Sequence, residues 1–220
     1  MRNDVLAAIA REKIILVVRG LSGEELFRAA DACLAGGICL LEVPFCADKS
    51  TGDAEIAACI RALRERYAGR MHVGAGTVLT AAEAELAAAA GAEFLVSPVA
   101  DPAVIRRTRE LGLVSVPGAM TPSEVYAAHT AGADFVKIFP AAQVGGPAYF
   151  QSLRGPFPHV KTVAFGGVTA AEIPAYLRAG AAGVGIASEI LDKKLLAAGD
   201  YAAITARARA CVQAAQGEQT

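Results

Sequence analysis

The sequence has little of what marks the nucleic-acid-binding and membrane classes of protein. Twenty-one basic residues face twenty-two acidic ones, so the formal net charge is only −1. A chain this close to neutrality lacks the basic surface expected for binding nucleic acids or anionic membranes. No apolar run reaches the length of a membrane-spanning helix. We therefore expect neither a nucleic acid nor a membrane as a partner.

Cysteine and histidine are too scattered to predict a metal site. The five cysteines are odd in number and form no C-x-x-C pair, which is typical of reduced thiols rather than of a disulfide framework. The three histidines, His72, His129 and His159, have no partner at metal-ligand spacing. The sequence therefore predicts no metal and no cofactor.

Apolar residues are abundant, at 54% of 220 residues, which is enough for an ample core. No linker, low-complexity tract or charge run marks a boundary, so we expect residues 1–220 to form a single domain. The first residues, from Met1 to Val5, are charged and lack the apolar core of a signal peptide. A cytoplasmic location is the resulting expectation.

Short apolar runs alternate with helical segments along the whole chain. A leading helix is expected at residues 5–10. The predicted strands lie at 14–19, 39–43, 71–73, 93–97, 113–116, 134–139, 160–165 and 182–186. The helices that follow them are predicted at 24–34, 52–67, 80–91, from 102 onward, 122–132, 147–153, 169–180 and 188–196, with a closing helix at 200–215.

Eight strand–helix pairs in a chain of this length predict an α/β protein, a (β/α)₈ TIM barrel preceded by a short helix. The structural alternative is an open doubly wound sheet. That fold normally has a G-x-G-x-x-G turn after its first strand, whereas here the first strand is followed by Arg19-Gly20-Leu21-Ser22-Gly23. The barrel is therefore the favoured fold.

One predicted strand, residues 134–139, carries a lysine between apolar neighbours. Strand alternation places Phe135, Lys137 and Phe139 on one face and Val136 and Ile138 on the other. Burial disfavours the charged amine and lowers its pKa toward the nucleophilic range, which suits attack on a carbonyl and formation of a Schiff base. The structural alternative is an edge-strand lysine that extends to water. Three other lysines, Lys161, Lys193 and Lys194, are expected to be solvated.

Two more charges occur at the same end of the predicted barrel. Arg19 ends the first strand, and Glu42 lies between Leu41 and Val43 in the second. Active sites of such barrels lie at the C-terminal ends of the strands, where Lys137 also projects. A purely structural Glu42–Lys137 ion pair is the alternative, but a buried pair stabilises less than apolar packing does. The three charges together favour a catalytic site.

A glycine-rich segment follows each of the last two predicted strands. Gly166 and Gly167 precede Thr169, and Gly185 is followed closely by Ser188. Glycines let backbone N–H groups approach an anion, and helix N-termini attract negative charge. Because these loops form the usual phosphate site of a TIM barrel, the sequence predicts phosphate binding at this point.

Several ordered motifs give the chain a resemblance to a known family. They are Leu41-Glu42-Val43-Pro44, Gly74-Ala75-Gly76-Thr77-Val78, Val96-Ser97-Pro98, Val116-Pro117-Gly118, Lys137-Ile138-Phe139-Pro140, Gly155-Pro156-Phe157-Pro158 and Gly166-Gly167-Val168-Thr169. Over nearly its whole length the chain resembles the 2-keto-3-deoxy-6-phosphogluconate and 2-keto-3-deoxy-6-phosphogalactonate aldolases, a family that includes 4-hydroxy-2-oxoglutarate aldolases. The resemblance implies a homotrimeric, metal-free class I aldolase.

The resemblance also implies roles for individual residues. Lys137 falls on the Schiff-base lysine of the family, and Glu42 on its acid/base glutamate. Positions that line the pyruvate end and the phosphate site match as well. The pyruvate end comprises Thr77, Pro98 and Phe139, and the phosphate site Gly166, Gly167 and Ser188.

Two departures from the family pattern bear on the substrate. Cys46 stands where many gluconate-type members have an arginine, a charge that Arg19 could supply instead. Phe165 stands where they have a threonine, and its ring would narrow the site around the sugar hydroxyls. The expected reaction is cleavage of a 2-keto-3-deoxy-6-phospho sugar acid to pyruvate and glyceraldehyde 3-phosphate. An aldolase for non-phosphorylated 4-hydroxy-2-oxo acids, and a phosphate-binding barrel without Schiff-base chemistry, are the alternatives.

Overall fold

The computed structural model describes residues 2–46 and 51–217, so residues 1, 47–50 and 218–220 of the predicted domain lie outside the described part. The strands are β1 (Ile14–Val17), β2 (Leu40–Pro44), β3 (His72–Gly76), β4 (Phe94–Val96), β5 (Val114–Val116), β6 (Gly118–Ala119), β7 (Val136–Ile138), β8 (Thr162–Phe165) and β9 (Gly183–Ile186). The helices are α1 (Arg2–Glu12), α2 (Gly23–Ala35), α3 (Asp53–Arg66), α4 (Ala81–Ala89), α5 (Pro102–Glu110), α6 (Pro122–Thr130), α7 (Gly146–Arg154), η1 (Ala170–Glu172), α8 (Ile173–Arg178), α9 (Lys193–Ala198) and α10 (Tyr201–Gln216).

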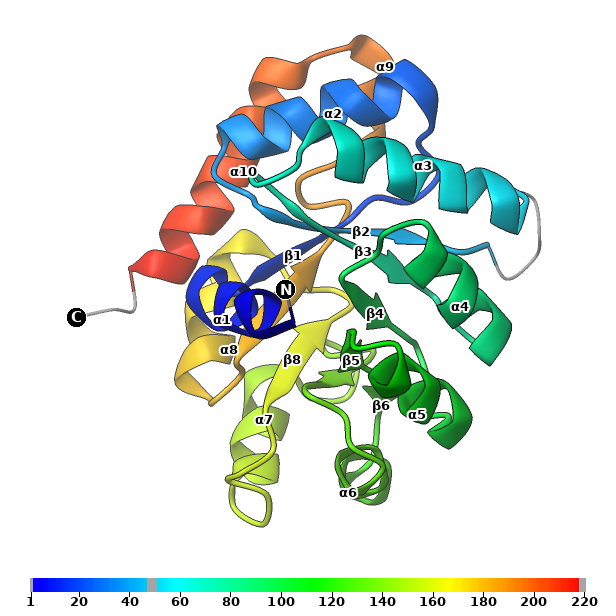
Figure 1. Cartoon of the computed structure of the whole chain (residues 1–220). Coiled ribbons are helices and arrows are strands. Elements are labelled where there is room, and N and C mark those ends of the chain that lie inside the picture. The colour runs from blue at the N-terminus through cyan, green and yellow to red at the C-terminus, as the bar shows by residue number, and fades with distance from the viewer. Residues whose placement is uncertain (1, 47–50, 218–220) are drawn as a thin grey trace.

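The strands of the described residues form one parallel sheet with helices around it (Figure 1). The strand order is β5-β4-β3-β2-β1-β9-β8-β7-β6. β5 and β6 are separated by Pro117 alone, and they pair with β4 and β7 respectively. Because proline donates no ladder hydrogen bond, it divides one strand of the barrel into two segments. The predicted (β/α)₈ barrel is confirmed.

Alternate residues of each strand pack into two separate cores. One core lies between the strands and the outer helices, and it includes Leu16, Val136 and Ile138. The other fills the barrel interior, and it includes Val17 and Phe135. The predicted division of the lysine strand between two faces is therefore confirmed, and Lys137 belongs to the interior face.

Helix α1 lies across the end of the barrel from which the strands start (Figure 1). Its buried residues Val5 and Ile9 join the interior core at the end opposite the C-terminal ends of the strands. Arg2 forms an ion pair with Asp134, whose other carboxylate oxygen accepts a hydrogen bond from the N–H of Ser115. Side chains of α1 therefore fill this end of the barrel interior.

The largest difference from the predicted elements follows β9. The segment after β9 is not helical from residue 188. It forms a turn, and α9 begins at Lys193 after the capping residue Asp192, whose carboxylate accepts from the N–H groups of Lys194 and Leu195. An aspartate cap at the true start outweighs Ser188 as a helix signal. Ser188 consequently lies in a loop.

No helix in the described residues is long and apolar enough to cross a membrane.

Candidate active site

A cavity of about 270 Å³ opens at the C-terminal ends of the barrel strands. Of the residues predicted for the site, nine line it. They are Arg19, Glu42, Lys137, Phe139, Phe165, Gly166, Gly167, Gly185 and Ser188. Residues from β1, β2, β7, β8 and β9 or the loops after them therefore meet around one space.

Glu42 enters this cavity from the middle of β2. Its register partners are Val17 of β1 and Gly74 of β3, and the residue is only 2% exposed. The carboxyl group lies against the backbone of Gly76, where an added Cβ would be 2.7 Å from Glu42 Cδ. Its Oε2 atom has no hydrogen-bond partner among the described residues. A buried carboxyl oxygen without a partner is costly and is typical of a functional group.

Lys137 enters from β7 and is 8% exposed. Its Nζ lies 4.8 Å from the centroid of the Phe139 ring and 4.7 Å from that of the Phe165 ring. Ring faces attract cations but form no strong hydrogen bond, so they replace only part of the lost hydration. The Lys137 amine therefore lies between two aromatic rings, and the residue also lines the cavity.

Burial shifts the two groups in opposite directions. It raises the pKa of Glu42 to about 7, although Lys137 and Arg19 oppose the rise with their charges. It lowers the pKa of Lys137, an effect that the Glu42 charge opposes and the Arg19 charge reinforces. Both directions have desolvation as their main cause, because a charged group is stabilised less inside the protein than in water.

Within the described residues, no salt bridge joins Glu42 to Lys137, and Glu42 Oε2 lacks a partner altogether. The structural ion pair considered as an alternative is thus absent from this structure. The charge of each side chain still shifts the pKa of the other, and both side chains line the cavity. A carboxyl group that titrates near neutrality beside an amine of lowered pKa is suited to proton transfer and nucleophilic attack.

The loops after β8 and β9 form a group of open backbone donors. Gly166 and Gly167 have φ values of 90° and 76°, in the left-handed region that glycine adopts at low cost. In the described part of the chain, the N–H groups of Gly167, Val168 and Ser188 donate to no protein acceptor. Consecutive open N–H groups of this kind can hold an anion.

An acidic side chain lies in the same wall of the cavity. Glu189 lines it beside Ser188, and its Oε1 accepts a hydrogen bond from the N–H of Ala170 at the start of η1. No sequence pattern predicted Glu189 as a site residue. Its position directly after Ser188, in a loop predicted to bind phosphate, was the available signal. A carboxylate here reduces the positive potential that a phosphate would meet.

Phe165 depends on a neighbouring glycine. A Cβ added to Gly185 of β9 would lie 2.1 Å from the Phe165 ring, which is far inside van der Waals contact. The glycine predicted for an anion site thus also makes room for the aromatic wall against Lys137. Gly76 makes room for Glu42 in the same way, although it was not predicted as a site residue. The glycine-rich segment after the third predicted strand was the signal that could have indicated it.

Two residues predicted for the pyruvate end, Thr77 and Pro98, lie near this edge of the barrel but do not line the cavity. Thr77 follows β3 with φ of 53°, a conformation that is uncommon for a β-branched residue. Cys46 does not line the reaction cavity either. It contributes instead to a separate space of about 40 Å³ together with Cys59.

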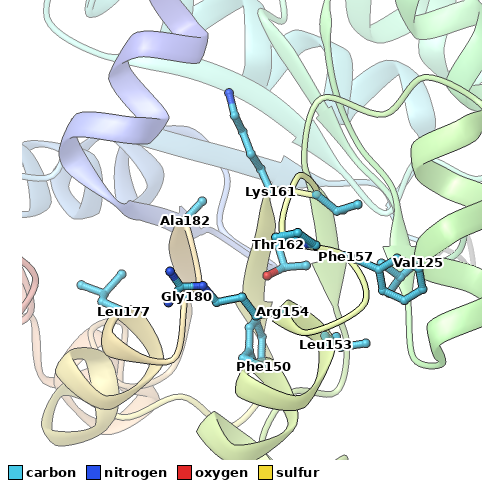
Figure 2. A pocket seen from close by; sticks show the side chains of 12 residues that line it. Val125, Phe150, Leu153, Arg154, Phe157, Lys161, Thr162, Leu177, Gly180 and Ala182 are labelled. Carbon is cyan, nitrogen blue, oxygen red and sulfur yellow. The ribbon is translucent and has the colours of Figure 1, made fainter.

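A second cavity, of about 370 Å³, lies toward the opposite end of the barrel (Figure 2). It is lined by Phe150 and Leu153 of α7 and by Arg154, whose guanidinium extends beside Gly180. Figure 2 shows Lys161 projecting away from the other labelled side chains, and Lys161 is exposed, as predicted, like Lys193 and Lys194. Among the described residues that line it, no carboxyl, histidine or cysteine side chain accompanies these cations, so the first cavity is the better candidate for the reaction chemistry. Among residues 2–46 and 51–217, no cluster of three or more acidic, histidine or cysteine side chains suits a metal ion.

A family model and the curated relatives of this chain indicate the same protein family. The family model described as KDPG and KHG aldolase matches residues 5–207. The chain is 34% identical to the 2-dehydro-3-deoxy-phosphogluconate aldolase of Treponema pallidum (strain Nichols) over 212 residues, which cover 95% of this chain and 96% of that protein. It is 35% identical to the probable 2-dehydro-3-deoxy-6-phosphogalactonate aldolase of Rhizobium meliloti (strain 1021), with 85% of each chain covered.

Solved structures agree with these relatives. The chain superposes on the KDPG aldolase of Legionella pneumophila, captured with pyruvate as a covalent carbinolamine intermediate, with a TM-score of 0.83. The two are 28% identical, and the match covers 94% of this chain and 97% of that one. Because the family model, the relatives and the fold all agree over most of the chain, the chain belongs to the KDPG and KHG aldolase family and is an aldolase, a carbon–carbon lyase.

Proposed function

We propose that the protein is a class I aldolase that cleaves a 2-keto-3-deoxy-6-phospho sugar acid, of gluconate or galactonate type, to pyruvate and glyceraldehyde 3-phosphate. The observation that carries the proposal is the pairing of two buried groups in one cavity. Glu42 has a pKa raised to about 7 and Lys137 has a lowered pKa, and no salt bridge joins them in the described structure.

The first step is attack of the neutral Lys137 amine on the C2 ketone. The lowered pKa increases the fraction of amine that carries a lone pair at neutral pH. The carbinolamine loses water and becomes an iminium, which is a cation at the former position of the ammonium. Phe139 and Phe165 flank that position, so their ring faces stabilise the charge that the reaction creates.

The second step breaks the C3–C4 bond. Glu42, directly or through a water molecule, removes the proton of the C4 hydroxyl while the bond electrons move into the iminium. Glyceraldehyde 3-phosphate leaves, and the enamine of pyruvate remains on Lys137. Glu42 then returns a proton to C3, and hydrolysis of the new iminium releases pyruvate. A carboxyl group with a pKa of about 7 can both accept and donate a proton near neutral pH, because its ionised and its protonated forms are both populated there.

The remaining site residues are assigned to binding. Thr77 and the backbone near Pro98, which lie beside the cavity and not in its lining, are assigned to the carboxylate of the pyruvate half on the family resemblance. The open N–H groups of Gly167, Val168 and Ser188, in the loops that Gly166 and Gly185 precede or begin, are assigned to the phosphate. Arg19, which is exposed at the cavity mouth, supplies positive charge in place of the arginine that Cys46 replaces.

One observation favours a second candidate, an aldolase for non-phosphorylated 4-hydroxy-2-oxo acids such as 4-hydroxy-2-oxoglutarate. The Glu189 carboxylate lines the anion loop and already accepts the hydrogen bond of Ala170 N–H. The Glu189→Gln variant separates the two candidates. It should raise kcat/KM severalfold for a phosphorylated substrate, because it removes a repulsive charge. It should leave kcat/KM for a substrate without phosphate nearly unchanged.

The Schiff base is tested by borohydride reduction in the presence of pyruvate, followed by peptide mass mapping. We expect one reduced adduct, on Lys137. Lys137→Arg should abolish the adduct, whereas the matched control Lys161→Arg, at an exposed lysine, should retain it. No adduct, or adducts spread over surface lysines, would contradict the mechanism and favour a phosphate-binding barrel without covalent chemistry.

We further propose that the chain acts as a homotrimer in the cytoplasm and that residues 1–220 form a single domain. The family model supports the domain proposal, because it extends over residues 5–207. Size-exclusion chromatography with light scattering tests the trimer, and a monomer at micromolar concentration would refute it.

A further inference from the structure

A groove of about 560 Å³ adjoins the reaction cavity on the side of β1 and β9. Four residues line both spaces, namely Val17, Arg19, Ala187 and Ser188. The groove continues between the start of α2 and helix α9, which lie beside each other in Figure 1. A molecule bound at Lys137 can therefore extend past Ser188 into this groove without leaving the protein surface.

The groove has a largely apolar lining with a few polar and charged residues. Arg19 and Ser188 lie at the shared wall. The apolar part of the lining is formed mainly by Leu21, Leu191 and Leu196, and the exposed charged residues Glu25 and Lys193 complete it. Leu191 is 7% exposed, and the other two leucines are partly buried, so the three leucines form a packed wall rather than isolated surface residues. Such a surface gains by covering an apolar ligand.

The groove lies on the side of the leaving aldehyde. In the proposed mechanism the pyruvate half is bound covalently to Lys137, and the aldehyde half reaches toward the loops after β8 and β9. Ser188 and Ala187 belong to the second of these loops and also line the groove. A chain attached to the aldehyde carbon thus has two directions open to it, the anion loop and the groove.

We propose that this groove is a second acceptor compartment and that the enzyme also adds pyruvate to unbranched aliphatic aldehydes, whose alkyl chain occupies it. The proposal rests on the aldolase function given above. The C3 carbon of the Lys137-bound enamine attacks the aldehyde carbon and forms the new C–C bond. The aldehyde oxygen takes a proton from Glu42, and water hydrolyses the iminium. The products are a 4-hydroxy-2-oxo acid with an alkyl tail and free Lys137, without oxidation or reduction.

The test measures aldol addition of pyruvate to propanal, butanal and hexanal with the full chain. If the alkyl chain is buried, kcat/KM should rise roughly twofold to fourfold for each added methylene, as expected from the free energy of burying one CH₂ group. The readout is the ratio of kcat/KM for hexanal to that for propanal, which cancels any general loss of activity. A ratio of one or below would overturn the proposal.

Two variants on one helix localise the effect. Leu196→Gln places an amide in the groove and should lower the hexanal-to-propanal ratio severalfold. The control Ala198→Gln changes an exposed residue of α9 that does not line the groove, and it should keep the wild-type ratio. If Leu196→Gln and the wild type have equal hexanal-to-propanal ratios, the alkyl chain of the aldehyde does not bind in the groove, and the proposal is refuted.

Borohydride trapping of pyruvate on the same preparations separates the two levels of inference. A normal Lys137 adduct with a flat aldehyde series would refute the groove proposal while leaving the aldolase function intact. If pyruvate gives no adduct and no aldehyde gives product, both proposals fail. A Lys137 adduct together with a rising series supports both.

Discussion

The free energy of unfolding of Glu42→Gln, measured relative to that of the wild type, should increase as the pH rises. Glu42 has a pKa of about 7 in the folded protein, against 4.5 as the reference value for an exposed glutamate. Folding therefore favours the protonated form, and this contribution to stability is fully present below the unfolded pKa of 4.5 and lost as pH rises through about 7. Glutamine keeps the shape of the side chain but cannot ionise, so the variant does not lose stability over this range.

The size of the effect follows from the shift. The difference between 4.5 and about 7 corresponds to about 3 kcal/mol once the carboxyl group is ionised. This value already includes the opposing attraction of the Lys137 and Arg19 charges, and the range from about pH 5 to about pH 8 spans most, but not all, of the titration. We expect the stability of Glu42→Gln relative to the wild type to rise by about 2 kcal/mol between about pH 5 and about pH 8, or about 5 °C in Tm.

Thermal unfolding followed by far-ultraviolet circular dichroism measures this difference at both pH values. Glu93→Gln is the matched control, because Glu93 is 5% exposed but is paired with Arg64. That variant breaks an ion pair and should destabilise the protein at neutral pH. A difference between Glu42→Gln and wild type that does not change with pH would refute the raised pKa and, with it, the acid/base assignment of Glu42.

Three further predictions concern the same cavity. Gly76→Ala should lower kcat at least about tenfold with an unchanged circular dichroism spectrum, because the new Cβ, 2.7 Å from Glu42 Cδ, displaces that carboxyl group. An unchanged kcat would show that the position of Glu42 is unimportant. Gly185→Ala should cost about 1–3 kcal/mol in urea unfolding by overpacking Phe165, and adding Phe165→Leu should restore most of it; a double variant no more stable than the single one would contradict this contact. Cleavage should fall about tenfold per pH unit below about pH 7 in a pH–rate profile of kcat/KM, because the base form of Glu42 is lost there, and a flat acid limb would exclude Glu42 as the base.

The barrel and the two central residues could be predicted from local patterns. Continuous apolar runs such as residues 14–18 are typical of strands buried on both faces, and capping residues such as Thr121 and Asp101 mark helix starts. Strand alternation also placed Lys137 and Phe135 on one face, which the interior core confirms. The helix expected from Ser188 was wrong, because a stronger cap, Asp192, lies four residues later.

The residue types alone predict Lys137 and Glu42 as reactive groups, because a lysine or a glutamate is unusual within an apolar strand. How these two side chains are arranged depends on the folding of the whole barrel. The absence of a Glu42–Lys137 salt bridge, the two rings around Lys137 and the carboxylate of Glu189 in the anion loop depend on side chains from different strands. The reason is physical: strand patterns are set by neighbours along the chain, whereas burial, and the pKa shifts that follow from it, are set by residues distant in sequence that closure of the barrel brings together.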